Sequence, residues 1–181
     1  QKHNIDITPR YYKDLLRRLP QGSREERVQR LRSVVDDFAS EIIREKFKIL
    51  KWFEDNIEGG ACIPFSMYFF LLYSGMPYSL ENRYDLMLAT LPYPKEVTPL
   101  PIFIAGYPGH SFNAIFIGTE FTEDQMTDIR NWLLVDLIPG SQNREIVDFQ
   151  LRVIDPADRQ EYNRGELKIY LPTSYVNLGD S

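Results

Sequence analysis

The sequence of 181 residues has little of what metal and cofactor sites need, with a single cysteine and only two histidines. One cysteine excludes an intramolecular disulfide framework, and so few soft ligands argue against a zinc site. The sequence also lacks a phosphate-binding loop, a dinucleotide fingerprint and a calcium loop. We therefore expect neither a cofactor nor a bound metal.

Long apolar runs and an excess of basic charge are missing as well. The longest apolar stretch, residues 62–73, contains a proline and a serine. It is too short to cross a bilayer, which takes roughly 20 residues. The net charge is −5, whereas binding to nucleic acid phosphates requires a basic surface. No secretory signal is visible at Gln1. We expect a soluble protein with no integral membrane span and no nucleic acid partner.

What is present is enough for a sizeable core, since 43% of the residues are hydrophobic and 13% are aromatic. Charge is distributed unevenly, with a net +2 in residues 1–58 and a net −7 in residues 59–181. Nearly all glycines and prolines lie in the second part. We expect a single structural domain, in which a helical lead-in (1–58) packs on a mixed core (59–181).

Helical patterns dominate the first half of the chain. Ser23 and Glu26 form a capping box, in which each side chain bonds to the other residue's backbone N–H. Apolar residues at helical spacing follow this box. The expected helices span about residues 9–18, 24–56 (one long helix or two abutting ones), 65–73 (buried, with Pro64 in its first turn) and 80–91.

The second half changes to short segments of β-branched and aromatic residues, bounded by Gly, Pro, Asn and Asp, which predict strands. The expected strands are residues 102–105, 110–117, 132–137, 149–154 and 167–171. Residues 122–131 form a loop or a helical turn. Helices followed by strands indicate an α+β fold with an antiparallel sheet.

The only cysteine, Cys62, follows two glycines and an alanine at the predicted start of the buried helix. A helix N-terminus stabilises negative charge, so a thiol there tends toward the nucleophilic thiolate. The glycines allow a substrate backbone to approach closely. The alternative is a small buried hydrophobic residue, which a free cysteine often is.

Three other residues have the chemistry to assist a thiol nucleophile. His110 heads a predicted strand after a Pro-Gly turn, where its imidazole serves as a general base or bonds only to backbone. Asp136 lies on the next strand and either orients an imidazole or forms a turn, and antiparallel pairing brings it beside His110. Asn56, six residues before Cys62, supplies an amide for an oxyanion hole or ends a helix.

The segments around these residues resemble the transglutaminase-like branch of papain-like cysteine enzymes. The nucleophile pattern G-x-C-x-x-[FY] is matched by residues 60–65, H-[AS]-[FW]-N by 110–113 and W-x-x-x-D by 132–136, in the order of the family. The resemblance covers about residues 56–155. It implies a papain-like catalytic core within residues 59–181.

The acid strand departs from the family pattern, because Asp136 is followed by Leu137, whereas that strand often ends in Asp-Pro. Asp155, which precedes Pro156 but lacks the tryptophan, is the reserve acid.

Members of this branch include peptidases, transglutaminases and bacterial toxin or effector deamidases, and a small chain with a helical preface is most similar to the deamidases. The resemblance implies a cysteine hydrolase with the triad Cys62, His110 and Asp136, which deamidates glutamine in a target protein through a thioester. It also implies a host protein as substrate and secretion into a host cell cytosol, where a lone thiol stays reduced. A thiol protease and a transglutaminase of the same fold are the alternatives.

A different class of function is compatible with the same sequence. In a non-catalytic protein-binding module, the helical preface and aromatic residues recognise a partner, and the three candidate residues do not converge. Basic residues of the preface also allow contact with an anionic membrane, although they equally fit a solvated helix face; they are Arg17, Arg18, Arg24 and Arg27.

Overall fold

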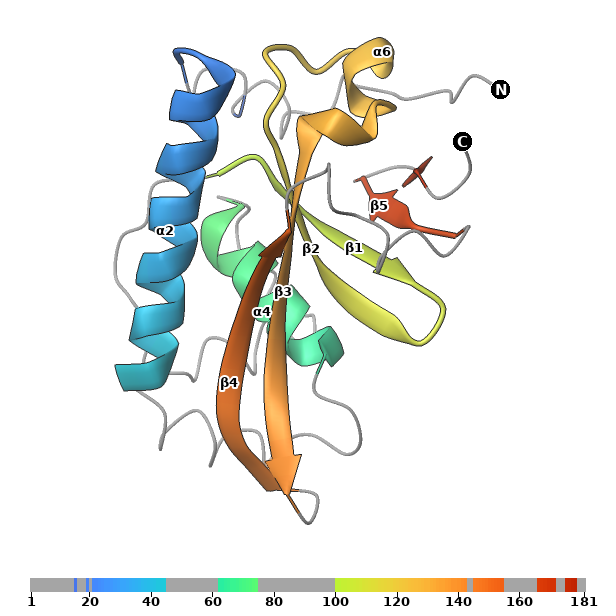
Figure 1. The fold of residues 1–181 in the computed structure, drawn as a ribbon. Helices are drawn as coiled ribbons and strands as arrows, with labels where there is room; N and C mark the ends of the chain where they lie inside the picture. Colours follow the sequence, from blue (N-terminus) through green and yellow to red (C-terminus); the bar gives the residue numbers. More distant parts are fainter. Residues whose placement is uncertain are drawn as a thin grey trace.

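The computed structural model describes residues 15, 19, 21–44, 62–74, 100–142, 145–154, 166–171 and 175–178. They form an α+β fold with an antiparallel sheet, which confirms the predicted class at this level (Figure 1). The helices expected over residues 9–18 and 80–91, and the long helix beyond residue 44, lie outside the described residues, apart from Leu15, which is buried.

The sheet has six strands: β1 (Ile102–Tyr107), β2 (His110–Phe116), β3 (Trp132–Gln142), β4 (Glu145–Ile154), β5 (Lys168–Tyr170) and β6 (Tyr175–Asn177). Their order is β4-β3-β2-β1-β5-β6, and each neighbouring pair is antiparallel. Five of the six strands are predicted by the sequence. The hairpin of β3 and β4 continues beyond the predicted ends through residues 138–142 and 145–148, which include proline, glycine and polar residues, and the three-residue β6 was not predicted.

The central strands β1, β2 and β3 are buried on both faces of the sheet. Successive residues of a strand point to opposite sides, so each of these strands contributes residues to both faces. The face that packs on the helices is called the helix face, and its residues include Ile102, Ile115, Leu133 and Val135. The opposite face is called the second face, and its residues include Phe103, Phe112, Ala114, Trp132 and Leu134.

Helix α2 (Arg24–Arg44) begins directly after the predicted capping box. The Glu26 backbone N–H donates to Ser23 Oγ at 3.2 Å, and the Ser23 N–H donates to Glu26 Oε1 at 3.4 Å. The predicted start of this helix is therefore confirmed. Its buried side carries Leu31, Val35 and Phe38, which pack in the same cluster as the helix face of the sheet.

Helix α4 (Cys62–Tyr73) lies beside α2 and contacts β1, β2 and β3 (Figure 1). It is the buried helix that the sequence predicts, with Pro64 in its first turn. The ring of Phe38 on α2 stacks on the ring of Phe69 on α4, with centroids 4.2 Å apart. Edges of Tyr68 and Tyr73 complete the surroundings of Phe38. This aromatic cluster joins the two helices.

A Phe38→Ala variant is expected to lower the free energy of unfolding by about 3–5 kcal/mol, because it leaves a cavity among the stacked rings. Phe38 is fully buried, whereas its neighbour Asp37 is exposed. Urea denaturation followed by circular dichroism measures the change. Asp37→Ala is the control and stays within about 0.5 kcal/mol of the wild type. Equal effects of the two substitutions contradict the packing assigned to Phe38.

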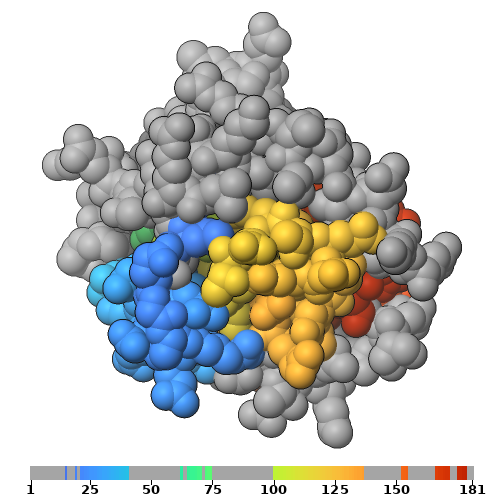
Figure 2. Space-filling model, turned by 90° about the horizontal axis from the view of Figure 1, so that it is seen from above, coloured from blue at the N-terminus to red at the C-terminus, as the bar shows by residue number. Residues whose placement is uncertain are grey.

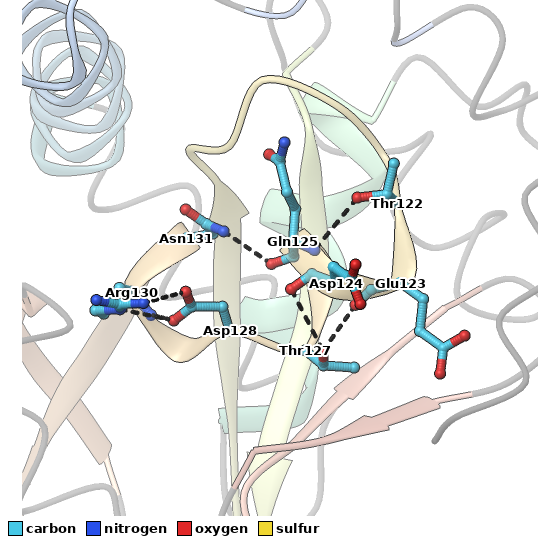
Figure 3. A network of polar contacts seen from close by, with 8 residues as sticks. All are labelled: Thr122, Glu123, Asp124, Gln125, Thr127, Asp128, Arg130 and Asn131. Carbon is cyan, nitrogen blue, oxygen red and sulfur yellow. Dashed lines mark hydrogen bonds and ion pairs between the residues drawn. The ribbon is translucent and has the colours of Figure 1, made fainter. Parts of the chain in front are cut away.

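The connection between β2 and β3 contains a short helix, α6 (Glu123–Met126), and a 3₁₀ turn, η1 (Ile129–Asn131). Figure 3 shows the polar network that folds it. The Gln125 N–H donates to Thr122 Oγ1 at 3.3 Å, and Asn131 Nδ2 donates to the Gln125 carbonyl at 2.9 Å. The residues expected as a loop or a helical turn therefore form one compact segment.

Charge also stabilises this connection. Arg130 donates to both carboxylate oxygens of Asp128 at 3.0 and 2.8 Å (Figure 3). The hydrogen bond from Arg130 lowers the pKa of Asp128. Helix α2 lies against the same region (Figure 2), where the Arg27 guanidinium donates to the Ile117 carbonyl at 3.1 and 3.0 Å.

Among the described helices, none is long and apolar enough to cross a membrane.

Candidate active site

The turn between β1 and β2 determines where His110 lies. Tyr107 pairs with His110, so only Pro108 and Gly109 connect the two strands. Gly109 has φ +89°, a conformation that glycine adopts without strain at the second central position of a Pro-Gly turn. Gly106 allows the strands to approach here, because a Cβ at this position would lie 2.7 Å from the His110 carbonyl oxygen. His110 is thus the first residue of β2, as the sequence predicts.

His110 and Asp136 meet through a short hydrogen bond. His110 Nε2 lies 2.7 Å from Asp136 Oδ2, and the two side chains are 23% and 3% exposed. The antiparallel pairing of β2 with β3 creates this contact, because Asp136 directly follows Val135, the partner of Asn113. The sequence analysis predicted that Asp136 lies beside His110. Because this bond occupies Nε2, Nδ1 is the ring nitrogen that is left for proton transfer.

The pair belongs to the second face of the sheet. The His110 ring packs against the rings of Tyr107 and Phe112, with both centroid distances 5.5 Å, and Phe112 is a residue of the second face. Asp136 alternates with Val135, which is on the helix face. On β4, Arg152 is the register partner of Asp136. Sequence reasoning missed Arg152, because the register of β3 and β4 shifts by one residue between Gly140 and Ser141, and a simple count from the hairpin does not include this shift.

Cys62 is the first residue of α4, as the sequence predicts, and it is partly exposed. One turn further along the helix, Ser66 Oγ lies 2.8 Å from Ser111 Oγ at the start of β2. At the other end of α4, the Tyr73 carbonyl accepts from Leu100 N–H just before β1. The helix therefore runs along β2 in the strand's own direction. Cys62 lies beyond the start of β2, at the end of the sheet where His110 stands.

Cys62 and His110 share this end of the sheet but approach it from opposite faces. Ser111 contacts α4, and His110, its neighbour in the strand, points to the second face. Within the described residues, no hydrogen bond joins the Cys62 thiol to the imidazole. The structure therefore brings two of the three predicted triad residues into contact. Asn56 and the reserve acid Asp155 lie outside the described residues.

A largely buried polar cluster beneath the second turn of α4 was not foreseen from the sequence. It consists of Ser66, Ser111 and Asn113, and Asn113 Nδ2 donates to the Ser66 carbonyl at 3.0 Å. The sequence pattern could have predicted this cluster, because Ser111 and Asn113 alternate in a strand whose later residues on the same face are isoleucines. Two polar residues on an otherwise apolar face indicate a polar partner across it.

Comparison with known proteins returns no match to this chain: no family model fits the sequence, and no curated protein or solved structure is significantly similar to it.

Proposed function

We propose that this protein is a cysteine hydrolase with a papain-like core, in which Cys62 is the nucleophile, His110 the general acid and base, and Asp136 the residue that orients His110. The observation that carries the proposal is the 2.7 Å bond between His110 Nε2 and the buried Asp136 carboxylate. A partly exposed cysteine opens a helix at the same end of the sheet.

The carboxylate assigns a role to each imidazole nitrogen. Asp136 accepts a hydrogen bond and therefore favours the tautomer that carries its proton on His110 Nε2. The lone pair then lies on Nδ1, which is the nitrogen able to take the thiol proton. When both nitrogens carry protons, the Asp136 charge stabilises the imidazolium. The N-terminal end of α4 favours the negative thiolate in turn.

The reaction needs only these groups and water. The Cys62 thiolate attacks the carbonyl carbon of a carboxamide, and the C–N bond breaks as the His110 imidazolium protonates the leaving nitrogen. A thioester remains on Cys62. His110 then takes a proton from water, the hydroxide attacks the thioester, and the carboxylic acid leaves with the thiolate restored. The sum is one carboxamide and one water converted to one acid and one ammonia. Catalysis requires the sulfur to come within hydrogen-bond reach of Nδ1 around the start of β2.

We propose the side chain of a glutamine in a host protein as the substrate, by resemblance to the effector deamidases, with action after secretion into a host cytosol. The attacked bond and the acceptor distinguish the alternatives. A peptide bond gives proteolysis, and a lysine amine in place of water gives transamidation. Ammonia without new N-termini identifies deamidation, new N-termini identify proteolysis, and incorporation of a labelled amine identifies transamidation.

The pH dependence of iodoacetamide alkylation tests the proposal without a known substrate. An unassisted thiol, with a pKa of about 8.5, is well under 1% thiolate at pH 6. A thiol that shares its proton with His110 stays reactive there. Alkylation of Cys62 at pH 6 is therefore expected to be more than about tenfold slower in His110→Ala than in the wild type. Equal rates in the two proteins remove the basis for the triad.

The second candidate is a non-catalytic protein-binding module. It is favoured by the placement of Cys62 and the His110–Asp136 pair on opposite faces, because catalysis requires all three to meet. Two exposed tyrosines also favour a binding module. Tyr170 and Tyr175 are cross-strand partners on β5 and β6 and are 50% and 48% exposed. Such a module predicts that partner binding survives Cys62→Ala and is lost with alanine at both tyrosines.

A further inference from the structure

We propose that Asn113 is a positioning residue of the proposed active site, which holds the second turn of α4 over β2 and thereby sets where Cys62, one turn earlier, lies relative to His110. This inference rests on the proposed function, because it assigns Asn113 a role in bringing the thiol to the imidazole.

The Asn113 amide is buried and bonds to two different elements. Its side-chain nitrogen donates to the Ser66 carbonyl on α4 at 3.0 Å and to the Phe103 carbonyl on β1 at 3.4 Å. Asn113 is 3% exposed and Ser66 is 2% exposed. One amide group therefore connects the helix to two neighbouring strands. Ser111 adds a second link through the 2.8 Å contact between its hydroxyl and that of Ser66.

These hydrogen bonds are directional, whereas the surrounding apolar contacts are not. Apolar packing is non-directional, so it permits a helix to rotate or slide on a sheet by small amounts. A hydrogen bond weakens steeply when its distance or angle departs from the preferred range. The bonds of the polar cluster therefore define the rotation of α4 about its axis and its height along β2.

The two reactive groups are the immediate neighbours of this cluster. Cys62 precedes Ser66 by four residues and so lies one turn earlier on the same side of α4. His110 directly precedes Ser111 in β2. A shift of α4 at Ser66 therefore moves the preceding turn with it and changes the distance between the thiol and the imidazole. A displacement of about 1 Å in such a pair is enough to cost about 100-fold in rate.

The test uses iodoacetamide as the probe and the ratio of the Cys62 alkylation rate at pH 6 to the rate at pH 9 as the readout. Asn113→Leu retains the approximate size of the side chain and removes the donor. We expect it to lower the ratio about tenfold, toward the value of His110→Ala, and to have no further effect in the His110→Ala background. Asn113→Gln, which keeps an amide, restores part of the ratio.

Asn131→Leu is the matched control. Asn131 Nδ2 also donates to a helical carbonyl, that of Gln125 at 2.9 Å, but in the connection between β2 and β3. This variant is expected to melt at a lower temperature with an unchanged ratio. If the role of Asn113 were purely structural, Asn113→Leu would also melt at a lower temperature and leave the alkylation ratio unchanged. An unchanged ratio in folded Asn113→Leu therefore overturns the inference.

Two outcomes separate this inference from the proposed function. A wild-type ratio that depends on His110 but not on Asn113 overturns the positioning role and leaves the hydrolase proposal intact. A wild-type ratio that does not depend on His110 overturns both. If Asn113→Leu does not fold, Ser111→Ala, which removes one hydroxyl from the same cluster, takes its place with the same expected and contrary results.

Discussion

A Cys62→Ala variant is expected to lose ammonia release from glutamine-containing proteins, with a decrease in kcat on the order of 10⁴-fold or more. The thioester cannot form without the sulfur, and the remaining groups bind and orient water only poorly. The assay measures ammonia from denatured casein and from a blocked glutaminyl dipeptide. New N-termini and incorporation of a labelled amine are recorded in the same samples, so that proteolysis and transamidation are detected too.

The fold of the variant needs a separate check, because Cys62 lies where α4 begins. Far-ultraviolet circular dichroism and the melting temperature are expected to stay close to the wild type, since the side chain is small and partly exposed. Met67→Ala, a larger truncation on the same helix, is the activity control. Ammonia release that persists in purified Cys62→Ala contradicts the role of the thiol, and the binding module then becomes the better account.

The sequence predicted the elements of this fold better than their extent. Apolar periodicity and a capping box are local signals, so the start of α2 at Arg24 and the buried helix α4 were both foreseen. The strand β6 and the continuation of β3 through Pro139 and Gly140 are not local. They depend on pairing with β5 and β4, which single-strand patterns do not record.

The candidate site shows the same division between local and long-range information. The approach of Asp136 to His110 followed from chain order and antiparallel pairing, because both residues lie on neighbouring strands. The position of Cys62 relative to them depends on which face of the sheet α4 covers. Strands β1, β2 and β3 have apolar residues on both sides, so alternation did not identify that face. For the same reason the sequence did not reveal the role of Asn113, whose partner lies across the helix–sheet interface.

Asp136→Asn is expected to reduce kcat by about 10²–10⁴-fold with little change in KM. Asparagine has the shape of aspartate but carries no negative charge, so the His110 imidazolium loses its counterion. The amide can also donate to Nε2, which reverses the tautomer and moves the ring proton to Nδ1, where the thiol proton must go. The pH profile of kcat is expected to lose its acidic limb or shift, a change that a merely structural role does not produce.

Asp128→Asn separates this effect from a general loss of aspartate. Asp128 also accepts from a cationic side chain, Arg130, but it lies in the connection between β2 and β3 and outside the proposed site. It is expected to keep full activity. If Asp136→Asn retains the wild-type kcat and pH profile, Asp136 does not act through His110. The 2.7 Å bond is then a stabilising contact of the second face, and the reaction must be assigned to other residues.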